Sequence, residues 1–170
     1  NGKDGLTIAD EAERQRLQEQ LDVLKEIQKV QEDIAASKAA ENLQDTQDVI
    51  ESKYSGGKTS DEYLEKLRRD ASGYEQQGLD PYSSMYDTES ASVQQLIANL
   101  KFLDEQKKNL NTTDSDYQEK LDRINQLYSE NNTQLLTQKQ SLLQYKQTLI
   151  DAGDTGSDAF KLINERLGEI

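Results

Sequence analysis

Residues 117–149, YQEKLDRINQLYSENNTQLLTQKQSLLQYKQTL, place a recurring set of side chains at steps that alternate between four and three residues. Such steps keep the set on one face of an α-helix and match the heptad of a coiled coil. The stretch therefore predicts a long helix that packs against a partner helix. The predicted seam consists of Tyr117, Leu121, Ile124, Tyr128, Asn131, Leu135, Gln138, Leu142, Tyr145 and Leu149.

Two of these seam positions carry amides, Asn131 and Gln138. Amides that are buried in a seam cost stability, but they can fix the helix register or the oligomeric state. The other interpretation places both side chains at exposed, loosely packed positions. The sequence leaves both interpretations open.

Another helix is predicted directly before this one, over about residues 88–110. Its apolar positions also alternate between steps of three and four, and its seam residues are Leu96, Leu100, Leu103 and Leu110. The connecting residues 111–116 are few and polar. A connection this short favours two neighbouring antiparallel helices. Residues 88–152 are therefore predicted to form a helical hairpin.

Residues 1–54 are predicted to be a long N-terminal helix, because no Pro or Gly lies between Gly5 and Ser55. Four alanines at 35, 36, 39 and 40 interrupt its row of larger apolar residues. These alanines either let a partner helix approach closely or make the middle of the helix weakly stable and frayed. The row itself consists of Leu17, Leu21, Leu24, Ile27, Ile34, Leu43, Val49 and Ile50.

Two shorter segments complete the predicted organisation. Residues 55–87 hold a short helix and a loop with the only proline, Pro81. Tyr82, Met85 and Tyr86 in that loop are candidates for contact with a partner protein, although aromatic side chains of helical proteins more often pack internally. Residues 153–170 begin a further helix, which we expect the chain to cut short.

The composition limits the size of any core. Apolar residues make up 33% of the 170 residues, charged residues make up 31%, and the net charge is −13. Low hydrophobicity with high net charge is also typical of disordered chains, but the regular apolar spacing favours helices. The predicted fold is all-α, with long helices that form antiparallel coiled-coil hairpins in an elongated molecule.

The same composition weighs against several classes of function. An acidic chain is poorly suited to bind phosphate backbones, so nucleic acid is not expected as the main partner. No apolar run reaches the roughly 20 residues of a membrane span. Without His or Cys, zinc sites and nucleophile–histidine pairs are not expected. We predict no catalytic residue, no cofactor and no metal site.

Three phrases share a polar turn, an aromatic residue and the start of a helix. They are Gly57-Lys58-Thr59-Ser60-Asp61-Glu62-Tyr63, Asn111-Thr112-Thr113-Asp114-Ser115-Asp116-Tyr117, and Asp151-Ala152-Gly153-Asp154-Thr155-Gly156-Ser157 leading to Phe160. In these phrases and the helices between them, the chain resembles a helical coiled-coil segment of phage tail tape-measure proteins, most clearly over residues 57–170. Members of that family are much longer, so we expect this chain to be a segment of a larger protein.

The resemblance implies a structural protein that lies extended in the tail tube, sets tail length during virion assembly and leaves through the tube on infection. Its partners would be other copies of itself or tail-tube proteins. It would be found in the virion tail and, during assembly, in the cytoplasm of the bacterial host. The alternative prediction is a helical binding or adaptor module of a secreted or cell-surface bacterial protein.

Overall fold

The computed structural model describes residues 2–170, with side chains described from residue 9 onward. Within that range the chain forms α-helices and one short 3-10 helix, and no strand. The predicted all-α class is therefore confirmed. The elements are α1 (Gly2–Tyr54), α2 (Ser60–Gln76), η1 (Ser83–Met85), α3 (Val93–Lys108), α4 (Tyr117–Asp151) and α5 (Asp158–Glu169).

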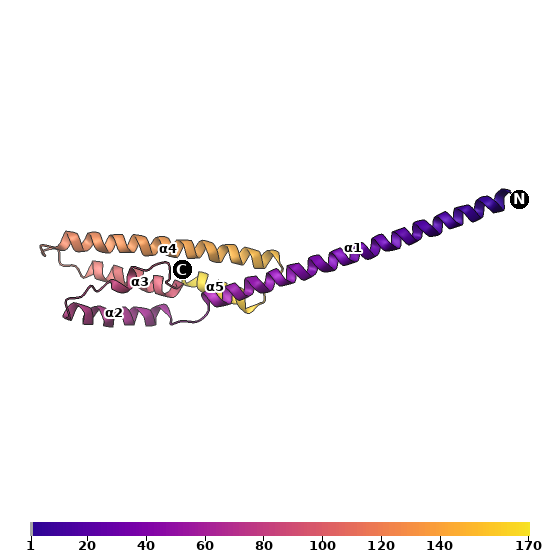
Figure 1. The fold of residues 1–170 in the computed structure, drawn as a ribbon. Helices are drawn as coiled ribbons and strands as arrows, with labels where there is room; N and C mark the ends of the chain where they lie inside the picture. The colour runs from indigo at the N-terminus through magenta and orange to yellow at the C-terminus, as the bar shows by residue number, and fades with distance from the viewer. Residues whose placement is uncertain (1) are drawn as a thin grey trace. The chain divides into compact units, whose positions relative to one another are not determined.

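Contacts divide the chain into two units at a point inside α1. Residues up to Asp45 form unit 1, and residues Thr46–Ile170 form unit 2. Figure 1 shows that unit 1 consists of α1 alone. The end of α1 and all later helices belong to unit 2, so the segments predicted separately as 55–87, 88–152 and 153–170 fold together.

Two of the three helix starts predicted by the repeated phrases use a hydroxyl cap. The backbone N–H of Glu62 donates to Thr59 Oγ1 at 3.2 Å, and that of Phe160 donates to Ser157 Oγ at 3.2 Å. These bonds satisfy N–H groups that have no carbonyl partner in the first turn of a helix. The third phrase differs, because Asp116 precedes α4 without capping it through its side chain.

The helix that follows Ser92 begins with a complete capping box. The N–H of Gln95 donates to Ser92 Oγ at 3.2 Å, and the N–H of Ser92 donates to Gln95 Oε1 at 2.7 Å. This reciprocal capping box ties the two ends of the first turn of α3 together. It also fixes where the loop after η1 enters α3.

Glycine ends two of the helices in the left-handed conformation. Gly78 has φ 71° after α2, and Gly153 has φ 72° after α4. Only glycine adopts this conformation without steric cost. The turn after α4 is closed by the N–H of Asp154, which donates to the carbonyl of Leu149 at 2.8 Å.

The core of unit 2 lies between α2, α3 and α4, which lie side by side in Figure 1. Helix α3 packs on both α2 and α4, and α5 packs on α4. One cluster of buried side chains joins α2, the η1 segment, α3 and the first half of α4. Its members are Leu64, Ala71, Met85, Ala98, Phe102, Leu103, Ile124 and Leu127.

Most of the predicted seam faces the interior of unit 2. The buried seam residues are Leu96, Leu103, Ile124, Leu135, Leu142 and Leu149, together with both amides, Asn131 and Gln138. The interpretation that placed these amides at exposed positions is wrong. Leu100, Leu110, Tyr117, Leu121 and Tyr145 are half-buried.

One seam position needs a correction. Tyr128 is 42% exposed, and its neighbour Leu127 is 3% exposed and belongs to the core cluster. Both positions lie three or four residues from Ile124 and from Asn131, so the heptad spacing admits either. Leucine suits the dry position in the core cluster, whereas the tyrosine hydroxyl stays in water.

Candidate protein-interaction surface

A buried polar layer positions the loop that holds the candidate contact residues. Asn99 Nδ2 of α3 donates to Asn131 Oδ1 of α4 at 2.9 Å. Asn131 Nδ2 donates to the carbonyl of Leu127 at 2.9 Å and to that of Met85 at 3.4 Å. A buried amide is costly unless it is hydrogen-bonded. The layer therefore fixes α3, α4 and the η1 segment relative to one another.

A second polar group joins the end of α1 to α4 and α5 within unit 2. Tyr54 Oη donates to Gln138 Oε1 at 3.3 Å, and the buried Arg166 Nε donates to the carbonyl of Tyr54 at 3.0 Å. Burial and the nearby Tyr145 raise the pKa of Tyr54 to about 12. The Tyr54 hydroxyl therefore keeps its proton, and remains a hydrogen-bond donor, to a higher pH than an exposed tyrosine does.

Asp80 organises the loop around Pro81. Its carboxylate accepts a hydrogen bond from the N–H of Tyr82 at 2.9 Å, from the hydroxyl of Tyr86 and from the guanidinium of Arg123. The Arg123 guanidinium lies 5.9 Å from the centre of the Tyr82 ring and 5.6 Å from that of Tyr86. Both distances are within the range of cation–π attraction.

The three candidate contact residues have different surroundings. Met85 is completely buried in the core cluster, so in this structure it is not on the surface. Tyr82 is half-buried and packs edge to face on Phe102, with ring centres 6.3 Å apart. Burial, together with Glu75, raises the pKa of the Tyr82 hydroxyl. Tyr86 is 47% exposed and is the one of the three that a partner could readily contact.

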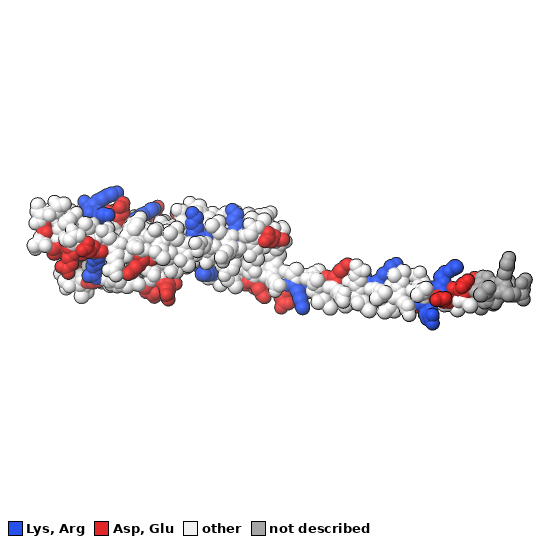
Figure 2. Space-filling model, turned by 90° about the horizontal axis from the view of Figure 1, so that it is seen from above, with Lys and Arg blue, Asp and Glu red and all other residues white. Residues whose placement is uncertain are grey.

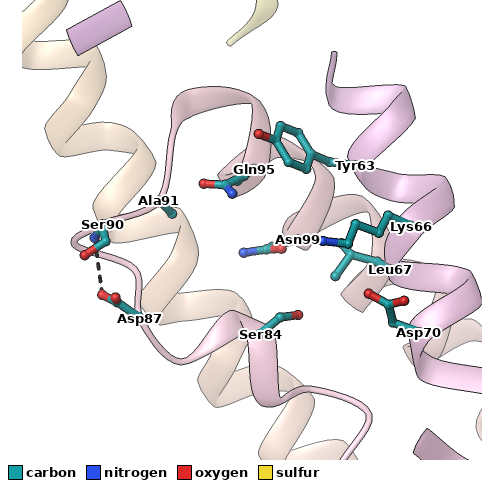
Figure 3. Close-up of a pocket in the computed structure, with 10 residues that line it drawn as sticks. All are labelled: Tyr63, Lys66, Leu67, Asp70, Ser84, Asp87, Ser90, Ala91, Gln95 and Asn99. Atoms are coloured by element: carbon teal, nitrogen blue, oxygen red, sulfur yellow. Dashed lines mark hydrogen bonds between the residues drawn. The ribbon is translucent and has the colours of Figure 1, made fainter. Parts of the chain in front are cut away.

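A small cavity lies between α2, the loop and α3 (Figure 3). Its volume is about 250 Å³, and it is lined by Tyr63, Lys66, Leu67, Asp70, Ser84, Asp87, Ser90, Ala91, Gln95 and Asn99. Several of its polar groups already have partners in the chain. Asp87 Oδ1 accepts a hydrogen bond from the N–H of Ser90 at 3.2 Å. Asn99 donates to Asn131, and Gln95 accepts from the N–H of Ser92. The cavity is therefore mainly a gap between helices with a polar rim.

No group of three or more acidic side chains among the described residues is arranged to hold a metal ion. Within residues 2–170, no helix combines the length and the apolar character that crossing a lipid bilayer requires.

A row of exposed apolar side chains lies on unit 1. From residue 9 to residue 42 every described residue of α1 is exposed. Seven large aliphatic side chains in this part are between 44% and 62% exposed: Leu17, Leu21, Val23, Leu24, Ile27, Val30 and Ile34. The pattern read from the sequence includes five of them and omits Val23 and Val30, which lie four residues before Ile27 and three residues after it.

The charges of unit 1 do not gather into a patch of one sign. Figure 2 shows acidic and basic side chains interspersed along α1 and over the visible face of unit 2. Two i, i+4 pairs support the exposed helix: Gln18 Nε2 donates to Asp22 Oδ1 at 3.0 Å, and Gln28 Nε2 donates to Glu32 Oε1 at 3.2 Å. Such pairs stabilise a helix by only about 0.2–0.5 kcal/mol each.

Comparisons with known proteins assign no family to this chain. No protein-family model matches the chain, and searches of curated proteins and of solved structures find no match.

Proposed function

We propose that this chain is a non-enzymatic structural segment of a phage or prophage tail tape-measure protein. The observation that carries the proposal is the exposed part of α1, in which a continuous helix presents large aliphatic side chains to solvent along residues 17–34. Apolar side chains exposed at helical spacing are typical of helices that pack against other proteins. A helix also converts residue number into length at about 1.5 Å per residue, which is what a ruler needs.

Unit 2 fits the same proposal as a helical module of the same chain. We propose that α3 and α4 form an antiparallel coiled-coil hairpin. Two observations support this pairing. Asn99 is hydrogen-bonded to Asn131, and Leu103 and Ile124, which are both closer in sequence to the turn between the two helices, belong to the same core cluster. Buried amides paired across helices are a known means of fixing the register of a coiled coil.

Changing the length of α1 tests the proposed function. Duplicating residues 10–44 in the parent gene adds 35 residues to this helix. If the chain is part of the ruler, tails measured by electron microscopy become longer by about 52 Å, at 1.5 Å per residue. A matched control replaces the same codons with synonymous ones. Unchanged tail length, or the absence of the chain from purified tails, would contradict the proposal.

A second candidate function is a helical adaptor that binds a partner through the Pro81 loop. The observation that favours it is the exposed Tyr86, held in place by Asp80 and next to Arg123. Tyrosine and arginine are enriched at protein interfaces. If the chain is an adaptor, Tyr86→Ala abolishes capture of a partner from the bacterial envelope. If it is part of a tape-measure protein, the same variant leaves tail length unchanged.

A further inference from the structure

The end of α1 is held in unit 2 by residues that come from late in the chain. Gln47 Nε2 donates to Asp154 Oδ2 at 2.7 Å, in the turn before α5. Further along α1, the carbonyl of its last residue, Tyr54, accepts a hydrogen bond from Arg166 Nε at 3.0 Å. The helices through which the chain enters and leaves unit 2 are therefore joined directly, although 112 positions separate Tyr54 from Arg166.

Arg166 is a buried cation, and most of its charge compensation comes from its own helix. Its side chain is 8% exposed, and Nη1 lies 3.5 Å from Glu165 Oε1 and 3.3 Å from Glu169 Oε1, both on α5. In the amide orientation that satisfies both groups, Gln94 Oε1 accepts from Arg166 Nη2 at 2.9 Å. Among the described residues, the partners that other helices supply are this amide oxygen and the carbonyl of Tyr54.

The Tyr54 carbonyl suits a cation because it lies at the end of a helix. Carbonyls of the last turn have no partner within the helix, and that end carries a partial negative charge. Taking a partner away from a buried charge is strongly destabilising. If α1 detaches, Arg166 loses this partner, and if α5 detaches, the carbonyl loses its donor. Attachment of α1 and docking of α5 are therefore coupled.

Buried side chains accompany these polar contacts. Ile50 of α1 and Ala159 and Ile163 of α5 are completely buried. The ring of Tyr54 packs edge to face on Tyr145 of α4, with ring centres 6.2 Å apart. Hydrogen bonds are stronger where water is excluded, because the local dielectric constant is lower. The bond between Arg166 and Tyr54 is therefore better placed to resist opening than one on the surface.

The order of the contacts shows the direction of the two segments. Gln47 precedes Tyr54 on α1, and its partner Asp154 precedes Arg166, which lies in the last turn of α5. The end of α1 and α5 therefore run in the same direction. Pulling the N-terminal side of α1 away from the C-terminal side of α5 slides two such segments past each other. Both contacts are then strained at once, so they resist more force than contacts that break in sequence.

We propose that the contacts Gln47–Asp154 and Tyr54–Arg166 form a mechanical clasp, which passes tension directly from α1 to α5 and shields α2, α3 and the first half of α4 from it. This inference rests on the proposed function, because tension along the chain arises when an extended protein is packed in a tail tube or leaves through it. Once the clasp opens, tension reaches the shielded helices, which then unfold and lengthen the chain.

Optical tweezers test the clasp on the full chain. The chain has no cysteine, so Glu41→Cys and a cysteine added after Ile170 provide two attachment points for pulling. At a constant force, Arg166→Ala makes opening of unit 2 about tenfold faster, because it removes a hydrogen bond of a charged group that the closed clasp requires. The matched control, Arg123→Ala, removes an arginine outside the clasp and leaves the opening rate within about twofold. Circular dichroism checks that each variant remains helical.

Hydrogen exchange without force tests the coupling of α1 with α5. In Arg166→Ala, amides of residues 46–54 and of residues 158–169 exchange about tenfold faster, and they do so together. Amides in the middle of α3 change within about twofold, because the core cluster around them is intact. This pattern separates the opening of a clasp from a general loss of stability.

Three results would overturn the proposal. They are an opening rate under force that Arg166→Ala leaves unchanged, an equal acceleration by Arg123→Ala, and a loss of exchange protection that is uniform over unit 2 or limited to α5. Tail length after duplication of residues 10–44 does not depend on the clasp, and the pulling experiment uses the isolated chain. Failure of the clasp and failure of the proposed function are therefore distinguishable.

Discussion

At the scale of single residues, Asn131 shows how a polar side chain specifies the packing of this protein. It is completely buried, and both ends of its amide are hydrogen-bonded. Among the described residues, no buried side-chain nitrogen or oxygen lacks a partner. From the sequence, Asn131 could be buried or exposed. The partner that decides the matter is Asn99, which lies 32 residues away on another helix.

Replacing the paired amides tests this interpretation. Asn131→Leu leaves the amide of Asn99 buried without its partner, so we expect a loss of about 1–3 kcal/mol in the free energy of unfolding. The double variant Asn99→Leu with Asn131→Leu removes both polar groups, and we expect it to be less destabilised than the sum of the two single variants. Urea unfolding followed by circular dichroism measures all four proteins. Strictly additive losses would show that the two amides are not energetically coupled.

At the scale of the helix, α4 shows how far a periodic pattern specifies the buried face. The heptad spacing correctly placed six of its apolar or amide positions in the interior, from Ile124 to Leu149. It failed at Tyr128, because Leu127 satisfies the same spacing. Because a helix has 3.6 residues per turn, the positions three and four residues after Ile124 both lie close to its buried face. The choice between them depends on the side chains of the neighbouring helix.

Adjacent substitutions on α4 test this assignment. We expect Leu127→Ala to lower the free energy of unfolding by about 2–5 kcal/mol, because it leaves a cavity in the core cluster. Tyr128→Ala removes a larger side chain from an exposed position, and we expect a change within about 0.5 kcal/mol. Thermal and urea unfolding of the two variants provide the comparison. A larger loss for Tyr128→Ala than for Leu127→Ala would restore the seam predicted from the sequence.

At the scale of the whole molecule, the chain contains two units that are stabilised differently. Unit 2 has a cluster of buried apolar side chains and two sets of buried, hydrogen-bonded polar side chains, whereas every described side chain of unit 1 before Leu43 is exposed. Most helical stability in proteins comes from packing of an apolar face rather than from intrinsic propensity. Unit 1 therefore needs a partner to be as stable as unit 2.

Hydrogen exchange measures this difference directly. At low protein concentration, we expect amides of residues 10–42 to exchange at least about tenfold faster than those in the middle of α3 and α4, because local opening of unit 1 breaks no buried contact. Equal protection of both units in dilute solution would show that unit 1 is already stabilised within a single chain.

The sequence by itself determined the all-α class and the approximate extent of the helices. These features depend on interactions within one or two helical turns, so local residue types are sufficient. Only the tertiary structure decided that Leu127 is buried in place of Tyr128, that Met85 lies in the core, and that Asn131 is paired with Asn99. Each of these outcomes depends on a side chain from a distant helix, which periodicity along one helix does not specify.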